Sequence, residues 1–426
     1  MPRIAPCTGL AARAVALLCL ACAAHAQEPA AAPTDPIFEA TTRDGSQIRG
    51  RVGGFEFRPD GSGLLSLLGE PPRSLAISDL VALQRADAAD APTSISPNAA
   101  YIALPEGDRV LASVTSGNPN ALELGPGVIS DIPVQLPLDR VLGVVFPAAT
   151  RSPDFLSRVR HLRDPARQGE TLALSNGDTQ TGSFAGLDTN LLRFDAGNGE
   201  AKIERDRALA LGFDPALIAY PKPKAPFLEL GLLDGSRFGV TDCRLDRGTL
   251  SGNSRMGLKF AIAWKNVAYV HVMSGEIVYL TSRQPAAAQF VAYLDHHPKS
   301  IGLDSTWDGS PIHLAGRAVE RGLGMLPRTL AAYRIEPGDS VFQASVGLDD
   351  RSGDQANVVF RVLVDRKEIF ASPPMSQGDA PIPVNINLKG GQLLVLVVEF
   401  GERGDVQDSA IWANARIIRD PASPRP

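Results

Sequence analysis

The stretch "LAAYRIEPGDSVFQASVGLDDRSGDQANVVFRVLVDRKEIF", from Leu330 to Phe370, decides the fold of the C-terminal part of the chain. Its segment "VFQASVG" (Val341–Gly347) alternates apolar and polar residues, which is typical of a strand with one covered face. The segments "NVVFRVLVD" (Asn357–Asp365) and "QLLVLVVEF" (Gln392–Phe400) are almost continuously apolar, as in central strands. Strands of these kinds without helices between them predict a two-layer β-sandwich or jelly roll.

Four segments characterise residues 288–420: "ERGLGMLPRTLAAYRI" (Glu320–Ile335), "VFQASVGLDD" (Val341–Asp350), "ANVVFRVLVDRKEIFAS" (Ala356–Ser372) and "GDAPIPVNINLKGGQLLVLVVEFGERGDVQDSAIWANARI" (Gly378–Ile417). In these segments this part of the chain resembles the NPCBM family of carbohydrate-binding modules. Their order and spacing cover the whole module. The resemblance implies a galactose-binding-like sandwich that binds glycans and is not an enzyme.

The stretch raises a question about two adjacent carboxylates, Asp349 and Asp350. In the family this sequence ends a strand and enters a polar loop, so the resemblance places Asp349, Asp350 and Asp354 near one another at the sandwich edge. Clustered carboxylate oxygens are ligands for calcium, so these three residues are candidate calcium ligands. The alternative is that one aspartate caps the turn and the others are solvated. A catalytic pair is disfavoured, because adjacent residues on a strand point to opposite faces.

Three residues are candidates for contact with a sugar: Trp307, Asp350 and Trp412. Trp307 lies in the loop-like segment "DSTWDGSP", where an aromatic ring could stack on a sugar, although packing in the core or at an edge is the alternative. Trp412 follows Ile411 where the family usually carries Asp-Trp, and Asp408 is displaced upstream. That departure leaves open that sugar binding has been lost.

The N-terminal two thirds of the chain contain a fourfold repeat. A turn with Gly after an acidic or amide residue occurs in "RDGSQIRGRV" (Arg43–Val52), "PEGDRVLASV" (Pro105–Val114), "SNGDTQTGSF" (Ser175–Phe184) and "LDGSRFGVTD" (Leu233–Asp242). About thirty residues later each is followed by a second marker, namely "SDLVAL", "LDRVLGVVF", "RDRALALGF" or "WKNVAYVHV". Gly after such a residue permits positive φ in a tight hairpin.

Each repeat therefore predicts roughly five short strands in a small barrel similar to SH3-like or Sm-like barrels. The four repeats span residues 37–86, 99–148, 168–215 and 226–282. Segments rich in Pro and Ala between them predict tethered, separate barrels. The only segment that suggests a helix is Ser152–Arg163. We expect the repeats to contact proteins, because they show no aromatic groove and no basic stripe.

The first 26 residues predict a signal peptide. Arg3 and Arg13 precede or flank a short apolar segment, and "AHA" at Ala24–Ala26 fits signal peptidase. Lipidation at Cys22 is the alternative, but Cys19 stands where a branched apolar residue is preferred. Cleavage would leave Cys243 as the one cysteine, so we expect no intrachain disulfide. We expect export to the periplasm, the cell envelope or the exterior, and no transmembrane segment in the mature chain.

Charge and the absence of catalytic motifs limit the classes of partner and function that the sequence allows. The formal net charge is −5 and becomes −7 when Arg3 and Arg13 are removed, which argues against nucleic acid as a partner. No His-Glu-x-x-His, Gly-x-Ser-x-Gly or phosphate-binding loop occurs, so we assign no catalytic residue. The sequence favours an exported, non-catalytic bacterial protein that binds a glycan or cell-surface polysaccharide. The alternative is an envelope structural or adhesion protein whose β domains contact envelope proteins.

Overall fold

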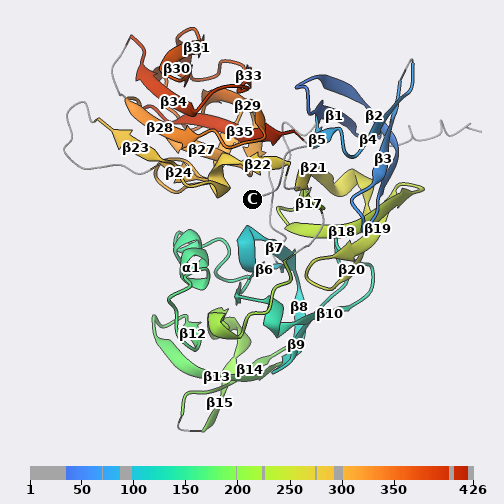
Figure 1. Ribbon diagram of the computed structural model, residues 1–426. Coiled ribbons are helices and arrows are strands. Elements are labelled where there is room, and N and C mark those ends of the chain that lie inside the picture. The colour runs from blue at the N-terminus through green and yellow to red at the C-terminus, as the bar shows by residue number, and fades with distance from the viewer. Residues whose placement is uncertain are drawn as a thin grey trace, which may run out of the picture. The chain divides into compact units, whose positions relative to one another are not determined.

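The computed structural model describes residues 35–69, 71–86, 98–197, 199–222, 226–273, 276–291, 301–402 and 407–420 (Figure 1). These residues are mostly β, as predicted. Helix α1 (Phe155–Leu162) lies within the segment predicted to be helical. No helix in these ranges is long and apolar enough to cross a bilayer. The predicted signal peptide falls outside the described residues.

Four consecutive units of strands follow the order of the sequence repeats. The first holds β1 (Ile37–Thr42), β2 (Gln47–Phe57), β3 (Gly63–Leu68), β4 (Arg73–Ala76) and β5 (Leu80–Arg85). The second holds β6 (Ala100–Ala103), β7 (Arg109–Ala112), β8 (Val114–Asn118), β9 (Ala121–Leu124), β10 (Val134–Pro137) and β11 (Gly143–Val145). The third holds β12 (Glu170–Leu174), β13 (Thr179–Leu187), β14 (Leu191–Asp195), β15 (Glu200–Glu204) and β16 (Ala208–Gly212). The fourth holds β17 (Phe227–Leu232), β18 (Arg237–Asp246), β19 (Thr249–Ser254), β20 (Lys259–Ala263) and β21 (Val267–Met273).

The repeated turn joins the first two strands of each unit. Its glycine has φ of 87° at Gly45, 85° at Gly107, 91° at Gly177 and 91° at Gly235. Only glycine adopts this left-handed conformation without steric cost, which explains why the turn recurs. In the last three units the second sequence marker begins with a single 3-10 turn that leads into the last strand.

The units are not separate barrels. Within each unit the first strand pairs with the second and the last, but the last strand also pairs with another unit: β5 with β21, and β11 with β16. Further pairs join β2 with β18, β7 with β18, and β8, which follows β7 along the chain, with β13. Six strands thus close a ring from the first and fourth units (β1, β2, β5, β17, β18 and β21), and the second and third units close a similar ring.

The linkers predict tethered units and leave open whether the units stack; the structure joins them through these strand pairs. The physical reason lies in the last strands, whose residues are mostly buried on both faces, as in "LVAL" of β5. A strand of this composition would leave an apolar edge exposed if its unit stood alone. Pairing between units covers that edge. Helix α1 packs outside the second ring, with Phe155 against Tyr101 at 5.3 Å between ring centres.

Two further sheets form the C-terminal sandwich. One contains β22 (Ile277–Tyr279), β24 (Gly302–Leu303), β27 (Gly322–Met325), β29 (Asp339–Leu348), β33 (Ile382–Asn387) and β35 (Ala410–Arg419). The other contains β23 (Ala287–Phe290), β28 (Thr329–Arg334), β30 (Asn357–Val364), β31 (Lys367–Ala371), β32 (Met375–Ser376) and β34 (Leu393–Phe400). A separate hairpin joins β25 (Ile312–Leu314) to β26 (Arg317–Val319).

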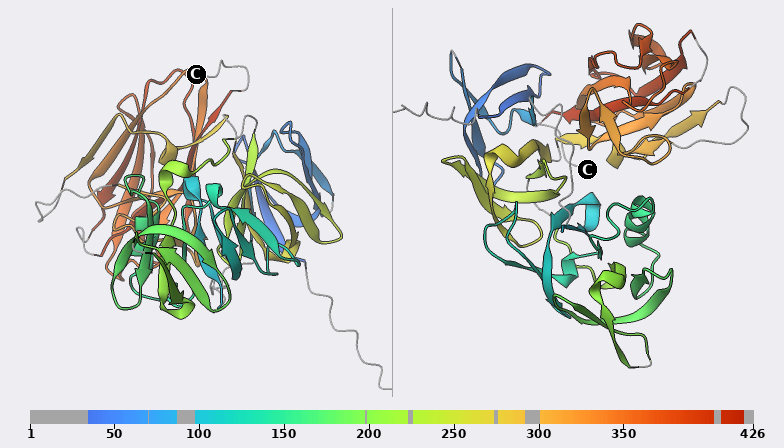
Figure 2. Two further views of the ribbon diagram at one scale, coloured as in Figure 1. Left: turned by 90° about the horizontal axis from the view of Figure 1, so that it is seen from below. Right: turned by 180° about the vertical axis from the view of Figure 1, so that it is seen from behind.

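The two sheets share one core, as the predicted sandwich requires. Phe342 and Trp412 come from the first sheet, Tyr333 and Phe360 from the second, and all four are fully buried in one cluster. Figure 2 shows the sandwich strands (orange and red) from two further directions. Strand β22 lies within the segment assigned to the fourth repeat but pairs with β35 of the sandwich.

Candidate functional site

One edge of the sandwich brings together the loop after β29 and the hairpin β25–β26. Asp349 is 1% exposed, and its carboxylate accepts hydrogen bonds from the backbone N–H of His313 at 2.8 Å and of Arg351 at 3.1 Å. Asp350 is exposed, and its carboxylate accepts a bond from the Gly316 N–H at 2.9 Å. The two adjacent carboxylates therefore have different partners, and both fix the hairpin to the loop.

The loop that carries Trp307 reaches the same edge. Arg351 donates through Nε to Asp349 at 2.9 Å and through Nη2 to the carbonyl oxygen of Pro311 at 2.7 Å. Thr306 closes the loop by hydrogen bonding to Asp308 and to the backbone of Ser310. The Trp307 side chain is half-buried, whereas Asp308 is exposed. We call the residues 304–319 and 349–354 the edge site.

Trp412 does not belong to the edge site. It is fully buried between the two sheets, where its ring lies edge-on to Phe360 with 5.3 Å between the ring centres. No face of this ring is open to a sugar, so the assignment of Trp412 as a sugar contact was wrong. The reason is that residues of β35 alternate between the core and the outer face, and Trp412 falls on the core side.

The three candidate calcium ligands lie in one loop but have separate roles. Asp349 is buried and bonded to N–H groups, while Asp350 and Asp354 are exposed. Across the described part of the chain, no group of three or more His, Cys, Asp and Glu side chains is arranged to hold a metal ion. The Asp349 carboxylate acts as a turn cap, which was the alternative drawn from the sequence.

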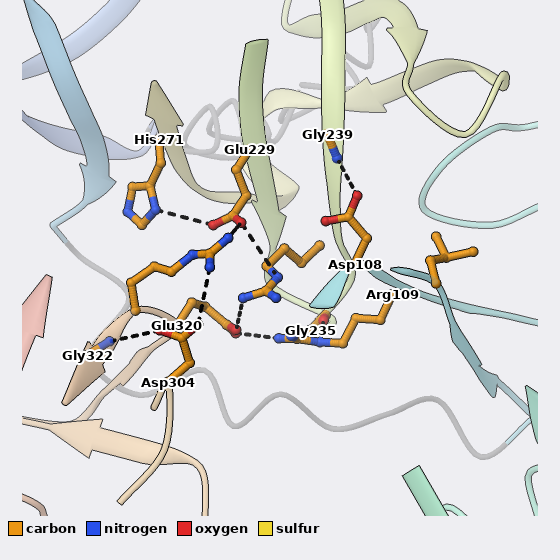
Figure 3. Close-up of polar contacts among 12 residues, drawn as sticks. Asp108, Arg109, Glu229, Gly235, Gly239, His271, Asp304, Glu320 and Gly322 are labelled. Atoms are coloured by element: carbon orange, nitrogen blue, oxygen red, sulfur yellow. Dashed lines mark hydrogen bonds and ion pairs between the residues drawn. The ribbon is translucent and has the colours of Figure 1, made fainter. Parts of the chain in front are cut away.

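A second polar feature links the sandwich to the repeats (Figure 3). We call it the buried charge cluster; its members are Arg109 from the second unit, Glu229, Arg237 and His271 from the fourth, and Asp304, Glu320 and Arg321 from the sandwich. Glu229 pairs with Arg321, lies 3.8 Å from Arg237 Nε and 3.4 Å from His271 Nδ1. Glu320 pairs with Arg109 and lies 3.3 Å from Arg237 Nη1.

The cluster balances its own charge. Burial alone would raise the pKa of Glu229, but Arg237 and Arg321 outweigh it and hold that pKa well below 4.5. Burial lowers the pKa of His271, and the hydrogen bond and charge of Glu229 offset this only in part. Burial raises the pKa of Asp304, although the Arg321 guanidinium 3.2 Å away opposes the shift. Three arginines face three carboxylates in a region shielded from water.

Our reading of the sequence missed the buried charge cluster. One signal was available, because Glu229 interrupts the otherwise apolar strand "FLELGL", and an isolated charge in a buried strand needs a partner. The partners of Glu229 could not be identified from the sequence, because Arg321 lies 92 positions away from it. No local pattern connects the two residues.

Residues 289–418 match the NPCBM/NEW2 domain family. This segment is an NPCBM domain. A protein of Renibacterium salmoninarum named as an endo-alpha-N-acetylgalactosaminidase is 29% identical over 117 residues, which are 28% of this chain and 8% of that protein. The chain thus matches only a small part of that relative.

Two solved structures illustrate the structural neighbours. The CBM51 module of a GH95 protein from Clostridium perfringens, in complex with methyl-galactose, is 24% identical, with 33% of this chain and 99% of that chain covered and a TM-score of 0.30. The tandem CBM51 modules of the family 98 glycoside hydrolase from Streptococcus pneumoniae are 11% identical, with 75% of this chain and 88% of that chain covered and a TM-score of 0.30.

Proposed function

We propose that this chain is an exported, non-catalytic protein that binds glycans through the edge site of its NPCBM domain. The observation that carries the proposal is the match of residues 289–418 to this family, and these residues form a sandwich with one buried core. The predicted signal peptide supports export to the periplasm, the envelope or the exterior. The repeats would then hold and present the sugar-binding domain.

The edge site has the chemistry that sugar binding uses. Trp307 offers part of an indole ring, on which the apolar face of a sugar can stack. Asp350 and Asp308 are exposed and can accept hydrogen bonds from sugar hydroxyl groups. Asp350 is held by the Gly316 N–H, so its carboxylate is positioned before a ligand arrives.

The same geometry opposes hydrolysis at this edge. A glycosidase needs two carboxyl groups that flank one bond. Asp349 is buried under His313 and Arg351, so it cannot reach a substrate beside Asp350. The adjacent pair therefore supports binding and not acid–base catalysis.

A role in protein contact is the second candidate, and one observation favours it. Leu64 and Leu68 of β3 are 46% and 56% exposed, next to β4, which within the described ranges pairs with β3 alone. An apolar patch beside a free strand edge suits a protein partner in the envelope. A pull-down experiment that compares the proteins captured by the unmodified chain with those captured by a Leu64→Asp, Leu68→Asp variant would test this role.

A glycan screen on the full chain tests sugar binding. We expect the unmodified chain to bind a glycan in this screen. The variants Trp307→Ala and Asp350→Ala should not bind that glycan, although their thermal unfolding should remain cooperative. Ile369→Ala, which removes an exposed apolar side chain from β31 of the same domain, should bind normally. Running the screen with calcium and with chelator tests the calcium proposal for Asp349, Asp350 and Asp354. A folded chain that binds no glycan would contradict the proposed function.

A further inference from the structure

A polar groove separates the first unit from the outer face of the sandwich. Residues of β1, β2 and β5 line one side and residues of β29, β33 and β35 line the other, the hairpin β25–β26 contributes as well, and the volume is about 400 Å³. Two hydrogen bonds close one end: Gln343 Nε2 donates to the Arg43 carbonyl oxygen at 3.1 Å, and Asn385 Nδ2 to that of Asp44 at 3.0 Å. The volume is within the usual range for small-molecule sites.

Amide side chains line both walls of this groove. Gln47 and Gln84 come from the first unit, and Gln343, Asn385 and Asn414 from the sandwich. Each amide both donates and accepts hydrogen bonds, which matches the hydroxyl groups of a sugar. The lining also holds one carboxylate, Glu39, and a second guanidinium besides Arg416, that of Arg317.

One buried cation in the groove has no carboxylate partner. Arg416 is 6% exposed and lines the groove, and its Nε donates to Gln343 Oε1 at 3.2 Å. Among the described residues, no carboxylate oxygen lies within ion-pair distance of Arg416. Burial lowers the pKa of Arg416, and the nearby Tyr279 raises it by less. A buried guanidinium without a counterion is unfavourable, so an anion in the groove would be stabilised there.

The backbone is distorted at the same place. Asn414 has φ of 53° within strand β35, and the pairing of β29 with β35 shifts register between Gln343 and Ser345. Left-handed conformations cost energy for residues other than glycine, although asparagine tolerates them best. Such strain concentrates at ligand sites, and here it accompanies the residues that line the groove.

We propose that this groove is a second ligand site, which binds an acidic sugar residue. The carboxylate of the sugar would pair with Arg416, and its hydroxyl groups would bond to the amides of both walls. The groove borders the edge site, since four hairpin residues (Leu314, Ala315, Arg317 and Val319) line it, but the proposed sugar contacts Trp307 and Asp350 do not. The ligand would also bridge the first unit and the sandwich, so its binding would tighten their contact.

Calorimetry on the full chain, with galacturonic acid and galactose as probes, tests the proposal. These sugars differ in the carboxylate at C6, so we expect the acid to bind at least about tenfold more tightly. Gln84→Ala should weaken binding of the acid, and Arg416→Gln should abolish the preference for it. Since Arg416 is buried and its variant could fail to fold, Gln47→Ala with Gln84→Ala provides a second test on the exposed wall.

Trp307→Ala separates this proposal from the proposed function. That variant should bind galacturonic acid as the unmodified chain does, even when its glycan binding at the edge site is lost. Equal affinity for the acid and the neutral sugar would overturn the proposal. So would loss of acid binding in Trp307→Ala while the Gln47 and Gln84 variants bind normally.

Discussion

Asp349 and Asp350 are neighbours in the chain, yet they lie in different surroundings. Asp349 is enclosed by backbone N–H groups and the Arg351 side chain, whereas Asp350 is exposed and meets one N–H group. Alternation along an extended chain turns one side chain inward and the next outward. The inner carboxylate therefore holds the edge site together, and the outer one is available to a ligand.

Asp349→Asn tests this division at the scale of the residue. The substitution replaces a buried acceptor by an amide that must face N–H donors, so we expect the free energy of unfolding to fall by about 1–3 kcal/mol. Asp350→Asn should cost less than about 1 kcal/mol, because the group is exposed. Urea denaturation measures both changes. If the Asp349 variant lost stability only when calcium is present, that result would contradict the capping role and support Asp349 as a calcium ligand.

The strands show how four similar sequence units become two rings. Strand β5 pairs with β21 through Ala82, Leu83 and Gln84, and β11 pairs with β16, so each ring uses the last strand of two units. The rings join the first unit with the fourth and the second with the third, and one further pair, β7 with β18, links the second unit to the fourth. The first ring therefore closes only when the fourth unit returns to the first.

Expression of separate units tests this arrangement at the scale of the element. A unit of about fifty residues buries too little surface to be stable alone. We expect residues 36–86 to be unfolded by circular dichroism and to gain β structure when mixed with residues 226–273. A mixture with residues 168–215 is the control and should stay unfolded. A folded monomer of residues 36–86 alone would contradict the ring.

Across the whole molecule, the buried charge cluster fixes the sandwich to the second and fourth units. Glu229 is the centre of the cluster, with Arg237, Arg321 and His271 around it and a side chain only 3% exposed. Buried ion pairs add little net stability when intact, but removing one partner leaves the other charge buried without a counterion, which is destabilising. The cluster therefore favours one arrangement of these parts over others.

Glu229→Gln should destabilise the chain by about 3–5 kcal/mol, because it leaves Arg237 and Arg321 without their shared carboxylate. Glu368→Gln breaks the exposed pair with Arg361 and should cost at most about 1 kcal/mol. Chemical denaturation of both variants gives the comparison. Equal effects of the two substitutions would show that the cluster does not stabilise this arrangement.

Two members of the cluster, His271 and Glu229, predict that acid weakens the fold, whereas the raised pKa of Asp304 acts in the opposite direction. The pKa of His271 lies below its ordinary value of 6.5, so as the pH falls below 6.5 the unfolded chain gains a proton that the folded chain does not. The free energy of unfolding should therefore decrease from about pH 6.5 downward, and decrease further below about 4.5 as Glu229 becomes protonated in the unfolded state.

Denaturation at a series of pH values measures this dependence. His271→Gln should flatten the decrease just below pH 6.5, because it removes the group that takes up the proton. The exposed residue His161 provides the matched control, and His161→Gln should leave the decrease as it is. If the two variants respond alike, burial of His271 is not the cause.

The sequence by itself determined the local structure. The glycine turns recur because positive φ requires them, and the apolar runs of β30 and β34 identify central strands of a sandwich. The helix at Phe155–Leu162 and the NPCBM domain were also evident from residues close together in the chain. All of these depend on patterns within a few tens of residues.

Only the tertiary structure decided which strands and side chains meet. The pairing of β5 with β21 joins residues nearly 190 positions apart, and the contact of Glu229 with Arg321 spans 92. Trp412 could not be placed in the core, nor Asp349 under the hairpin, before the register of β35 and β25 was known. The physical reason is that burial and charge pairing depend on distance in space, whereas a sequence pattern records only distance along the chain.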